Sequence, residues 1–182
     1  MPKVRHIEQR LIEAGVIQTG HFTAHNREEG DTKVVLDAVL AADSSHPELQ
    51  QAIVQVLAKK LSKYKPEIVI PLPEGGSHIG QKLARHLGAR AIMLDKNAES
   101  KELHLADQHE RIVIANTSGL IVLIDDVFRT GSQVEEAVGS LELSYKKLVV
   151  GVVWDRRSPE AEDEANRPVE SVVRRYVPMV SQ

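Results

Sequence analysis

Apolar runs that alternate with amphipathic segments are the feature that most constrains the fold of this chain. Between the runs, apolar residues recur at helical spacing, as in Ile79, Leu83 and Leu87. Strands that are apolar throughout are buried on both faces, which is typical of parallel sheets connected by helices. The pattern predicts an α/β fold with a doubly wound, mostly parallel sheet and helices on both faces. The expected strands are 67–70, 91–94, 111–115, 120–124, 147–154 and 169–177.

The remaining segments are predicted to surround that sheet. Helices are expected at 4–14, at 45–61 and from 132 onward, the second one opened by a capping box of Ser45 and Glu48. Residues 1–40 are expected to form an N-terminal helix and a small hood. Residues 96–110 are polar and have no period, which predicts a flexible lid loop. With no linker in sight, residues 1–182 are interpreted as a single domain.

Composition excludes several classes of function. The chain has 182 residues, of which 42% are hydrophobic and 27% charged, a balance typical of a globular domain. Aromatic residues make up only 3% and the net charge is −3, so we expect no nucleic-acid partner. The absence of Cys excludes disulfides and thiolate zinc sites. Without a signal peptide or a run long enough to span a bilayer, we expect a cytoplasmic protein with no membrane partner.

Two adjacent acids, Asp125 and Asp126, follow the apolar run 120–124, and a short loop then leads into a helix. Ligands of open α/β sheets bind beyond the C-terminal ends of the strands. Neighbouring carboxylates at such an end can accept hydrogen bonds from the two hydroxyls of a ribose. The alternative is an ordinary strand end with no ligand.

The loop that follows the acids has the features of a phosphate site. The backbone N–H groups of Thr130, Gly131 and Ser132 precede a helix, whose dipole favours an anion at that end. Gly131 lets the backbone approach a ligand without an intervening Cβ. The alternative is that Ser132 simply caps the helix. The candidate substrate-binding residues here are Val127, Phe128, Arg129, Thr130, Gly131, Ser132 and Gln133.

The segment 121–133 resembles the signature of the type I phosphoribosyltransferases, which has four apolar residues, two acids, two variable positions and a phosphate loop. The resemblance implies that Asp125 and Asp126 contact the ribose and that residues 130–132 hold its 5′-phosphate. Arg129, Ser132 and Gln133 depart from the commonest residues of that family at their positions.

The segment 71–77 resembles the pyrophosphate loop of the same family and contains Glu74, Gly75 and Gly76. Even without the resemblance, the residues of this segment indicate a second backbone-rich anion site between a strand and a helix. The acidic Glu74 departs from the small residue that the family often has, and its charge opposes pyrophosphate unless it acts through Mg²⁺. A plain Gly-Gly turn is the alternative.

Within the family, the chain is most similar to the orotate phosphoribosyltransferases. Residues 14–22 resemble their hood segment, and 154–157 contain the Asp-Arg pair that ends a strand in those enzymes. The resemblance implies that Arg156 contacts the acceptor base, for which a guanidinium fork is suited. Residues 23–31 depart from the orotate pattern, so the acceptor is left as orotate or a related pyrimidine or purine.

The resemblance also implies a catalytic mechanism and its partners. The expected reaction transfers phosphoribosyl from phosphoribosyl pyrophosphate (PRPP) to a base, with release of pyrophosphate. Mg²⁺ is the expected cofactor, held indirectly at Asp125 and Asp126 through ribose hydroxyls or water. Lys96 and Lys101, with Asp125 and Asp126, are the candidate catalytic residues, and the lysines meet the charge of the leaving group. A homodimer is expected, with the lid crossing between subunits.

A different class of function remains open from the sequence. A phosphoribosyltransferase-like regulator or a sensor of sugar phosphates or nucleotides would keep the signature and lack turnover. The altered hood and lid favour keeping this alternative. A nucleotide-binding P-loop is excluded because the chain has no Gly-x-x-x-x-Gly-Lys-Ser/Thr string.

Overall fold

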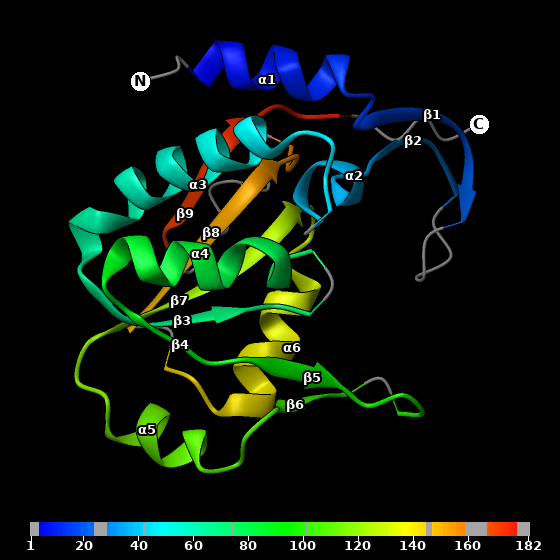
Figure 1. The fold of residues 1–182 in the computed structure, drawn as a ribbon. Helices are drawn as coiled ribbons and strands as arrows, with labels where there is room; N and C mark the ends of the chain where they lie inside the picture. The colour runs from blue at the N-terminus through cyan, green and yellow to red at the C-terminus, as the bar shows by residue number, and fades with distance from the viewer. Residues whose placement is uncertain are drawn as a thin grey trace.

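A parallel five-stranded sheet is the centre of the fold (Figure 1). The computed structural model of the protein describes residues 4–23, 29–41, 43–73, 75–100, 102–144, 147–158 and 167–177. All neighbouring strands of this sheet run parallel, which confirms the predicted sheet. In spatial order the strands are β4 (Arg90–Ala91), β3 (Pro66–Pro71), β7 (Leu120–Phe128), β8 (Leu148–Asp155) and β9 (Val169–Arg174).

Helices cover both faces of the sheet, as predicted, because the strands are apolar on both faces. Along β7, Val122 and Ile124 face one cluster of buried residues, and Ile121 and Leu123 face the other. The first cluster is closed by α1 (Val4–Glu13), α3 (Pro47–Leu61) and α4 (Ser77–Leu87). The second is closed by α5 (Glu110–Asn116) and α6 (Ser132–Leu141), and by a hairpin of β5 (Leu94–Lys96) and β6 (Leu103–Leu105).

The N-terminal hood is a β-hairpin that the sequence pattern did not reveal. Strand β1 (Ile17–Thr23) pairs antiparallel with β2 (Glu29–Val34), and a short helix, α2 (Asp37–Leu40), follows. The N–H of Val35 donates to the carbonyl of Val16 at 2.8 Å and so closes the base of the hairpin. The hood is thereby tied to the buried Leu36 that begins the turn into α2.

The strand predicted at 111–115 is wrong, because these residues form helix α5. Its run of β-branched residues favours a strand locally. In the fold, however, the sheet position beside β3 is occupied by β4. A helix buries Ile114 against the sheet and leaves Ile112 64% exposed, while Glu110 forms an ion pair with Arg90 at 2.8 Å. Tertiary packing therefore overrides the local propensity.

The long aperiodic loop predicted at 96–110 is also wrong at both ends. Lys96 belongs to β5, which pairs antiparallel with β6, and α5 begins at Glu110. The predicted strand 91–94 is likewise divided between β4 and β5. The hairpin turn is stabilised by the Asn97 side chain, which accepts hydrogen bonds from the N–H groups of Glu99 and Ser100. Whether this segment moves as a lid stays a prediction.

The capping box predicted at Ser45 and Glu48 is wrong. Helix α3 begins at Pro47, whose fixed φ suits the first turn, and no side chain caps it. The hydroxyl of Ser44 instead accepts the N–H of His46 at 3.0 Å. The helix ends in a short 3-10 turn, Ser62–Tyr64, before β3 begins.

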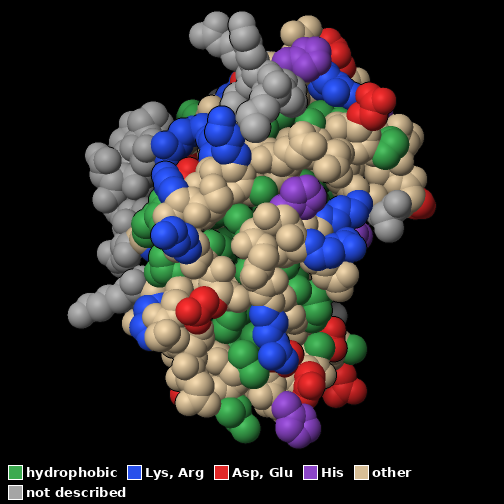
Figure 2. Space-filling view, turned by 60° about the vertical axis from the view of Figure 1, so that its left-hand side comes forward, with side chains coloured by type: hydrophobic (Ala, Val, Ile, Leu, Met, Phe, Trp, Pro, Cys, Tyr) green, Lys and Arg blue, Asp and Glu red, His purple; other side chains and the backbone are tan. Residues whose placement is uncertain are grey.

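One face of the molecule carries charge of both signs (Figure 2). Figure 2 shows Lys and Arg side chains in several separate groups among hydrophobic and neutral surface. Across the described ranges, each helix is too short or too polar to cross a bilayer.

Candidate active site

The two acids lie in β7 beyond the end of the neighbouring strand. Strand β3 pairs with β7 only as far as Pro71 opposite Ile124, whereas β8 continues along the other edge to Phe128. The predicted strand end at residue 124 is therefore wrong, since β7 includes both acids. Asp125 and Asp126 stand where β7 is no longer paired with β3, at the C-terminal end of the sheet where ligands of such folds bind.

The carboxylates are held by the backbone next to them. Asp125 is only 5% exposed, and its Oδ1 accepts the N–H of Asp126 at 2.9 Å. Oδ1 of Asp126 accepts the N–H of Val127 at 2.7 Å. Burial raises the pKa of Asp126, and the charge of Asp37 raises it further, against the lowering effect of these hydrogen bonds. A ligand that donates hydrogen bonds or brings positive charge would stabilise the charged form of this carboxylate.

The loop after the acids has the backbone geometry predicted for an anion site. Gly131 has a φ of 79° and directly precedes α6, a helix of 10 residues. The Thr130 and Ser132 hydroxyls lie 3.3 Å apart at the helix start, where the helix dipole attracts an anion. A Cβ on Gly131 would lie 2.9 Å from the ring of Phe128. Glycine is therefore required at position 131 both by the positive φ and by the nearby Phe128 ring.

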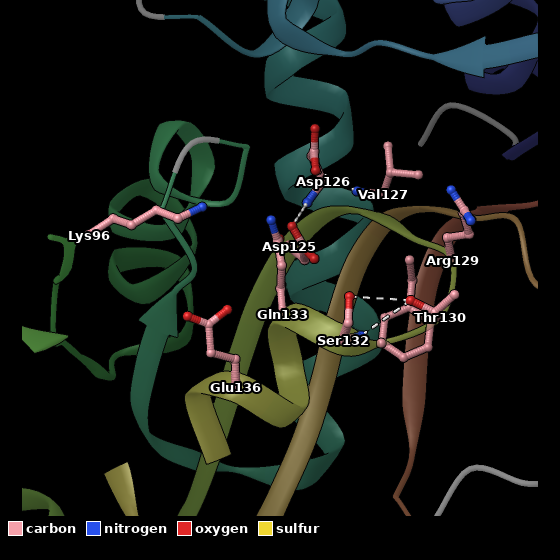
Figure 3. A pocket seen from close by; sticks show the side chains of 11 residues that line it. Lys96, Asp125, Asp126, Val127, Arg129, Thr130, Ser132, Gln133 and Glu136 are labelled. Atoms are coloured by element: carbon pink, nitrogen blue, oxygen red, sulfur yellow. Dashed lines mark hydrogen bonds between the residues drawn. The ribbon is translucent and has the colours of Figure 1, made fainter. Parts of the chain in front are cut away.

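One cavity of about 440 Å³ joins the acids to this loop (Figure 3). The Lys96 amine points into it from β5, and Arg129 extends from the other side. Every substrate-binding residue predicted in the segment 127–133 lines it. Among the described residues, the lining consists of Lys96, Asp125, Asp126, Val127, Phe128, Arg129, Thr130, Gly131, Ser132, Gln133 and Glu136.

Glu136 is a cavity residue that the sequence interpretation missed. It lies on the same face of α6 as Gln133, three positions earlier, so the helical spacing was an available signal. Its carboxylate and the Lys96 amine occupy the same side of the cavity. The second predicted lysine, Lys101, lies outside the described residues.

The second predicted anion loop packs directly on β7. A Cβ on Gly75 would lie 2.1 Å from Cγ of Asp126, and one on Gly76 would lie 2.1 Å from the carbonyl oxygen of Ile124. The N–H of Leu72 donates to that same carbonyl at 2.8 Å. The paired glycines therefore let this loop touch the acidic strand. Glu74, the third residue predicted there, lies outside the described residues.

A smaller cavity of about 180 Å³ borders Asp126 from the hood side. Its walls include Leu36 and Asp37, which come from the hood, and Gly75, from the second anion loop. Asp37 was missed because it follows a stretch without any period. The described residues that line it are Val34, Val35, Leu36, Asp37, Pro73, Gly75, Asp126 and Gln133.

Arg156 lies behind the cavity lining rather than in it. The side chain is 7% exposed, and a guanidinium nitrogen donates to the carbonyl of Val177 at 2.8 Å. Burial lowers its pKa, and the charge of nearby Arg129 lowers it further. The structure brings together the predicted ribose and phosphate residues, while the predicted contact of Arg156 with an acceptor stays a prediction.

Comparisons with known proteins point to one fold. A curated orotate phosphoribosyltransferase of a Thermoanaerobacter species is 26% identical over 165 residues, which cover 90% of this chain and 80% of that protein. The orotate phosphoribosyltransferase structure from Aeropyrum pernix matches with a TM-score of 0.67 at 15% identity, over 92% of this chain and 93% of that one. An APRTase structure from Giardia lamblia, complexed with 9-deazaadenine, gives 0.67 at 15% identity, over 97% and 100%. No family model matches the chain.

The similarity thus extends over most of the chain and includes the strand, loop and helix that form the large cavity. The chain has the phosphoribosyltransferase fold, and its predicted resemblance to the orotate phosphoribosyltransferases is confirmed.

Proposed function

We propose that this chain is a phosphoribosyltransferase that moves the phosphoribosyl group of PRPP to a nitrogenous base and releases pyrophosphate. The observation that carries the proposal is the single cavity that joins Asp125 and Asp126 to the anion loop at Gly131. A ribose 5-phosphate presents two hydroxyls and a phosphate, which match those two parts of the cavity in kind and in charge.

The proposed donor complex follows from these positions. The backbone N–H groups and hydroxyls of residues 130–132 hold the 5′-phosphate at the start of α6. Asp125 and Asp126 accept hydrogen bonds from the ribose hydroxyls. The pyrophosphate lies toward Gly75, since that loop touches Asp126 from the other side. Lys96, which faces the cavity, meets the negative charge of the leaving group.

The chemical step needs no nucleophile from the protein. A nitrogen of the base attacks C1 of the ribose, and the bond from C1 to the pyrophosphate oxygen breaks with its electron pair leaving on that oxygen. Positive charge develops on the ribose ring, so the neighbouring carboxylates stabilise the transition state. Fixed positions for donor and acceptor lower the entropic part of the barrier.

Mg²⁺ is the cofactor we propose for the donor complex. The described residues contain no group of three acidic or histidine side chains that could cage a metal. Mg²⁺ typically keeps several waters and binds one or two carboxylates together with substrate phosphates, which fits the pair Asp125 and Asp126. When bound, it supplies neutralising charge to the pyrophosphate.

We place the acceptor base on the hood side of the smaller cavity, beside residues 34–37, so that the base and the pyrophosphate at Gly75 lie on opposite sides of C1. The hood at residues 34–37 and the loop at Gly75 enclose this cavity from two sides, and a planar ring can lie between them. Asp37 adds a hydrogen-bond acceptor at its edge. Orotate, other pyrimidines and purines therefore all belong in the acceptor panel.

The test is pyrophosphate release from PRPP and Mg²⁺ with a panel of bases. Release with orotate supports the specificity of the curated relatives, and release with another base keeps the reaction and changes the acceptor. Binding of PRPP without release for any base would overturn the enzyme and favour a sugar-phosphate sensor.

Asp125→Asn combined with Asp126→Asn tests the site itself. We expect the double variant to lose PRPP binding by about a hundredfold or more, because two charged hydrogen-bond acceptors for the ribose are removed. Isothermal titration measures this, and thermal unfolding confirms that the fold persists. Asp43→Asn, which alters an exposed acid outside both cavities and outside residues 96–110, is the control and should bind PRPP as the wild type does.

We also propose that the protein is a cytoplasmic homodimer in which residues 96–110 reach the neighbouring active site. Lys101 and His104 would then add positive charge over the pyrophosphate. Light scattering of the purified protein measures the assembly. A monomer that releases pyrophosphate at full rate would contradict the shared site.

A further inference from the structure

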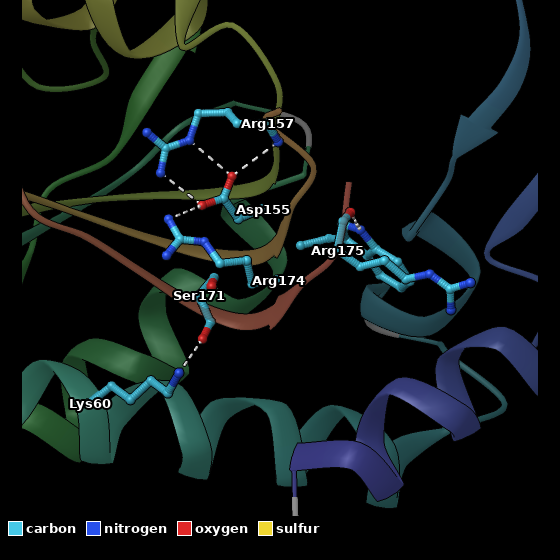
Figure 4. A network of polar contacts seen from close by, with 7 residues as sticks. Lys60, Asp155, Arg157, Ser171, Arg174 and Arg175 are labelled. Atoms are coloured by element: carbon cyan, nitrogen blue, oxygen red, sulfur yellow. Dashed lines mark hydrogen bonds and ion pairs between the residues drawn. The ribbon is translucent and has the colours of Figure 1, made fainter. Parts of the chain in front are cut away.

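A network of ion pairs surrounds the buried carboxylate of Asp155 (Figure 4). Through Phe128 it adjoins residues 129–132, the loop after β7 that we call the sugar-phosphate loop. Asp155, at the end of β8, is 1% exposed. The Arg157 guanidinium donates to both of its carboxylate oxygens, at 3.0 and 2.8 Å, and Arg174 donates to one of them at 3.2 Å. Burial alone would raise the pKa of Asp155, but the hydrogen bonds and charge of Arg157 outweigh burial and hold the pKa below its ordinary value.

The same guanidinium lies over an aromatic ring of the cavity wall. Cζ of Arg157 is 4.8 Å from the centre of the Phe128 ring, within the range of a cation–π contact. The Arg157 side chain is only 6% exposed, so water screens this contact little. Arg157 therefore holds two partners at once: a carboxylate at its edge and a ring at its face.

Phe128 in turn borders the loop that receives the phosphate. The ring is close enough that a Cβ on Gly131 would meet it at 2.9 Å. The Phe128 backbone is secured separately, since its carbonyl accepts the N–H of Arg156 at 2.9 Å. Strand pairing thus fixes the position of this residue, and the contact with Arg157 fixes the ring.

We propose that Arg157 is a positioning residue for the sugar-phosphate loop. Asp155 orients its guanidinium, the guanidinium holds the Phe128 ring, and the ring sets the backbone at Gly131 for the 5′-phosphate. The inference rests on the proposed function, because it assigns a purpose to the loop of that site. Arg157 itself does not line the cavity.

Arg174 provides a matched control within the same network. It donates to the same Asp155 oxygen as Arg157, but its side chain is 48% exposed and its contact is at the longer distance of 3.2 Å. A general effect of losing a cation from Asp155 should appear in both Arg157→Met and Arg174→Met. An effect carried through the Phe128 ring should appear in Arg157→Met alone.

The experiment titrates each variant with ribose 5-phosphate and, separately, with inorganic pyrophosphate. We expect Arg157→Met to weaken ribose 5-phosphate binding about tenfold and to leave pyrophosphate binding unchanged. Arg174→Met should keep wild-type affinity for both within about twofold, because an exposed pair contributes little. In steady-state assays, Arg157→Met should raise KM for PRPP more than it lowers kcat.

A double-mutant cycle with Phe128→Leu tests the route of the effect. If the ring transmits it, Arg157→Met should cost little further affinity for ribose 5-phosphate once Phe128 is replaced. Thermal unfolding of each variant establishes that it is folded. Equal losses in Arg157→Met and Arg174→Met, or additive losses in the cycle, would overturn the positioning role. A wild-type protein that binds no ribose 5-phosphate would instead overturn the proposed function.

Discussion

The two loops predicted to bind anions use glycine for different physical reasons. In the loop after β3, Gly76 has an ordinary φ of −69°, and glycine is required because the carbonyl of Ile124 occupies the place of a Cβ. In the loop after β7, Gly131 has a φ of 79°, which L-residues rarely adopt. One glycine allows two segments to approach each other, and the other allows the chain to turn.

The difference separates assembly of the site from its local shape. The β3 loop must pack on β7 before the two anion loops can border one ligand. The β7 loop must turn at Gly131 before its N–H groups can point at a phosphate. Substitutions in the first loop should therefore act mainly on folding stability, and those in the second mainly on phosphate binding.

Gly76→Ala should have the largest effect. Its new methyl group meets backbone at 2.1 Å, which cannot rotate away, so we expect a loss of about 3 kcal/mol in the free energy of unfolding. At this chain length the melting temperature should fall by about 10 °C. The control is Gly139→Ala, in helix α6, where a Cβ has no neighbour within 4 Å and alanine should raise helix stability. Equal melting temperatures for the two variants would show that close packing on β7 does not require glycine at position 76.

Gly131→Ala should have a smaller effect on stability and a specific one on binding. The φ of 79° costs about 1–2 kcal/mol with a side chain present, and the Phe128 ring must also shift. Gly88→Ala is its match, because Gly88 has a φ of 65° but a Cβ there has open space. Both variants should melt earlier, and only Gly131→Ala should lose affinity for ribose 5-phosphate. Similar affinities would show that the turn does not shape the phosphate site.

Asp126→Asn should have the smallest effect, and it has the opposite sign. Burial and the charge of Asp37 raise the pKa of Asp126, so the folded protein favours its protonated form. The stability from that form is complete below the ordinary pKa of 3.8 and is lost as pH rises through the raised value. At neutral pH, Asn should therefore raise the melting temperature by a few degrees.

Melting curves of Asp126→Asn and wild type across pH measure this difference. It should vanish as pH falls below 3.8. Asp107→Asn is the control with opposite sign, because hydrogen bonds from His109 lower the pKa of Asp107. If Asp126→Asn melts at a lower temperature than the wild type at neutral pH, then the charged Asp126 carboxylate does not destabilise the folded protein, and the prediction is wrong.

Local sequence patterns correctly predicted the elements that depend on residues close to one another in the sequence. The apolar run of β7, the acids after it and the helix beginning at Ser132 were predicted from adjacent residues, and the structure places them in one cavity. The alternation of buried strands and helices likewise predicted the parallel sheet. In these cases burial on both sheet faces and helix periodicity leave one solution.

Elements that depend on distant partners were not predictable in this way. The strand pattern of 111–115 became helix α5 because β4 fills the sheet edge, and the apparent loop 96–110 contains a strand because β6 returns to pair with β5. Asp37 borders the smaller cavity from the hood, far in sequence from Asp126.

The sequence by itself determined the parallel sheet, the pair of acids and the turn at Gly131, since each depends on contiguous residues whose local preferences agree. Only the tertiary structure decided how the two arginines after Asp155 are used. Arg156 bonds to the carbonyl of Val177, and Arg157 holds Asp155 and the Phe128 ring. The two adjacent arginines have different contacts because the partners of Arg157 come from separate strands, Asp155 from β8 and Phe128 from β7. No local sequence pattern predicts a contact between separate strands.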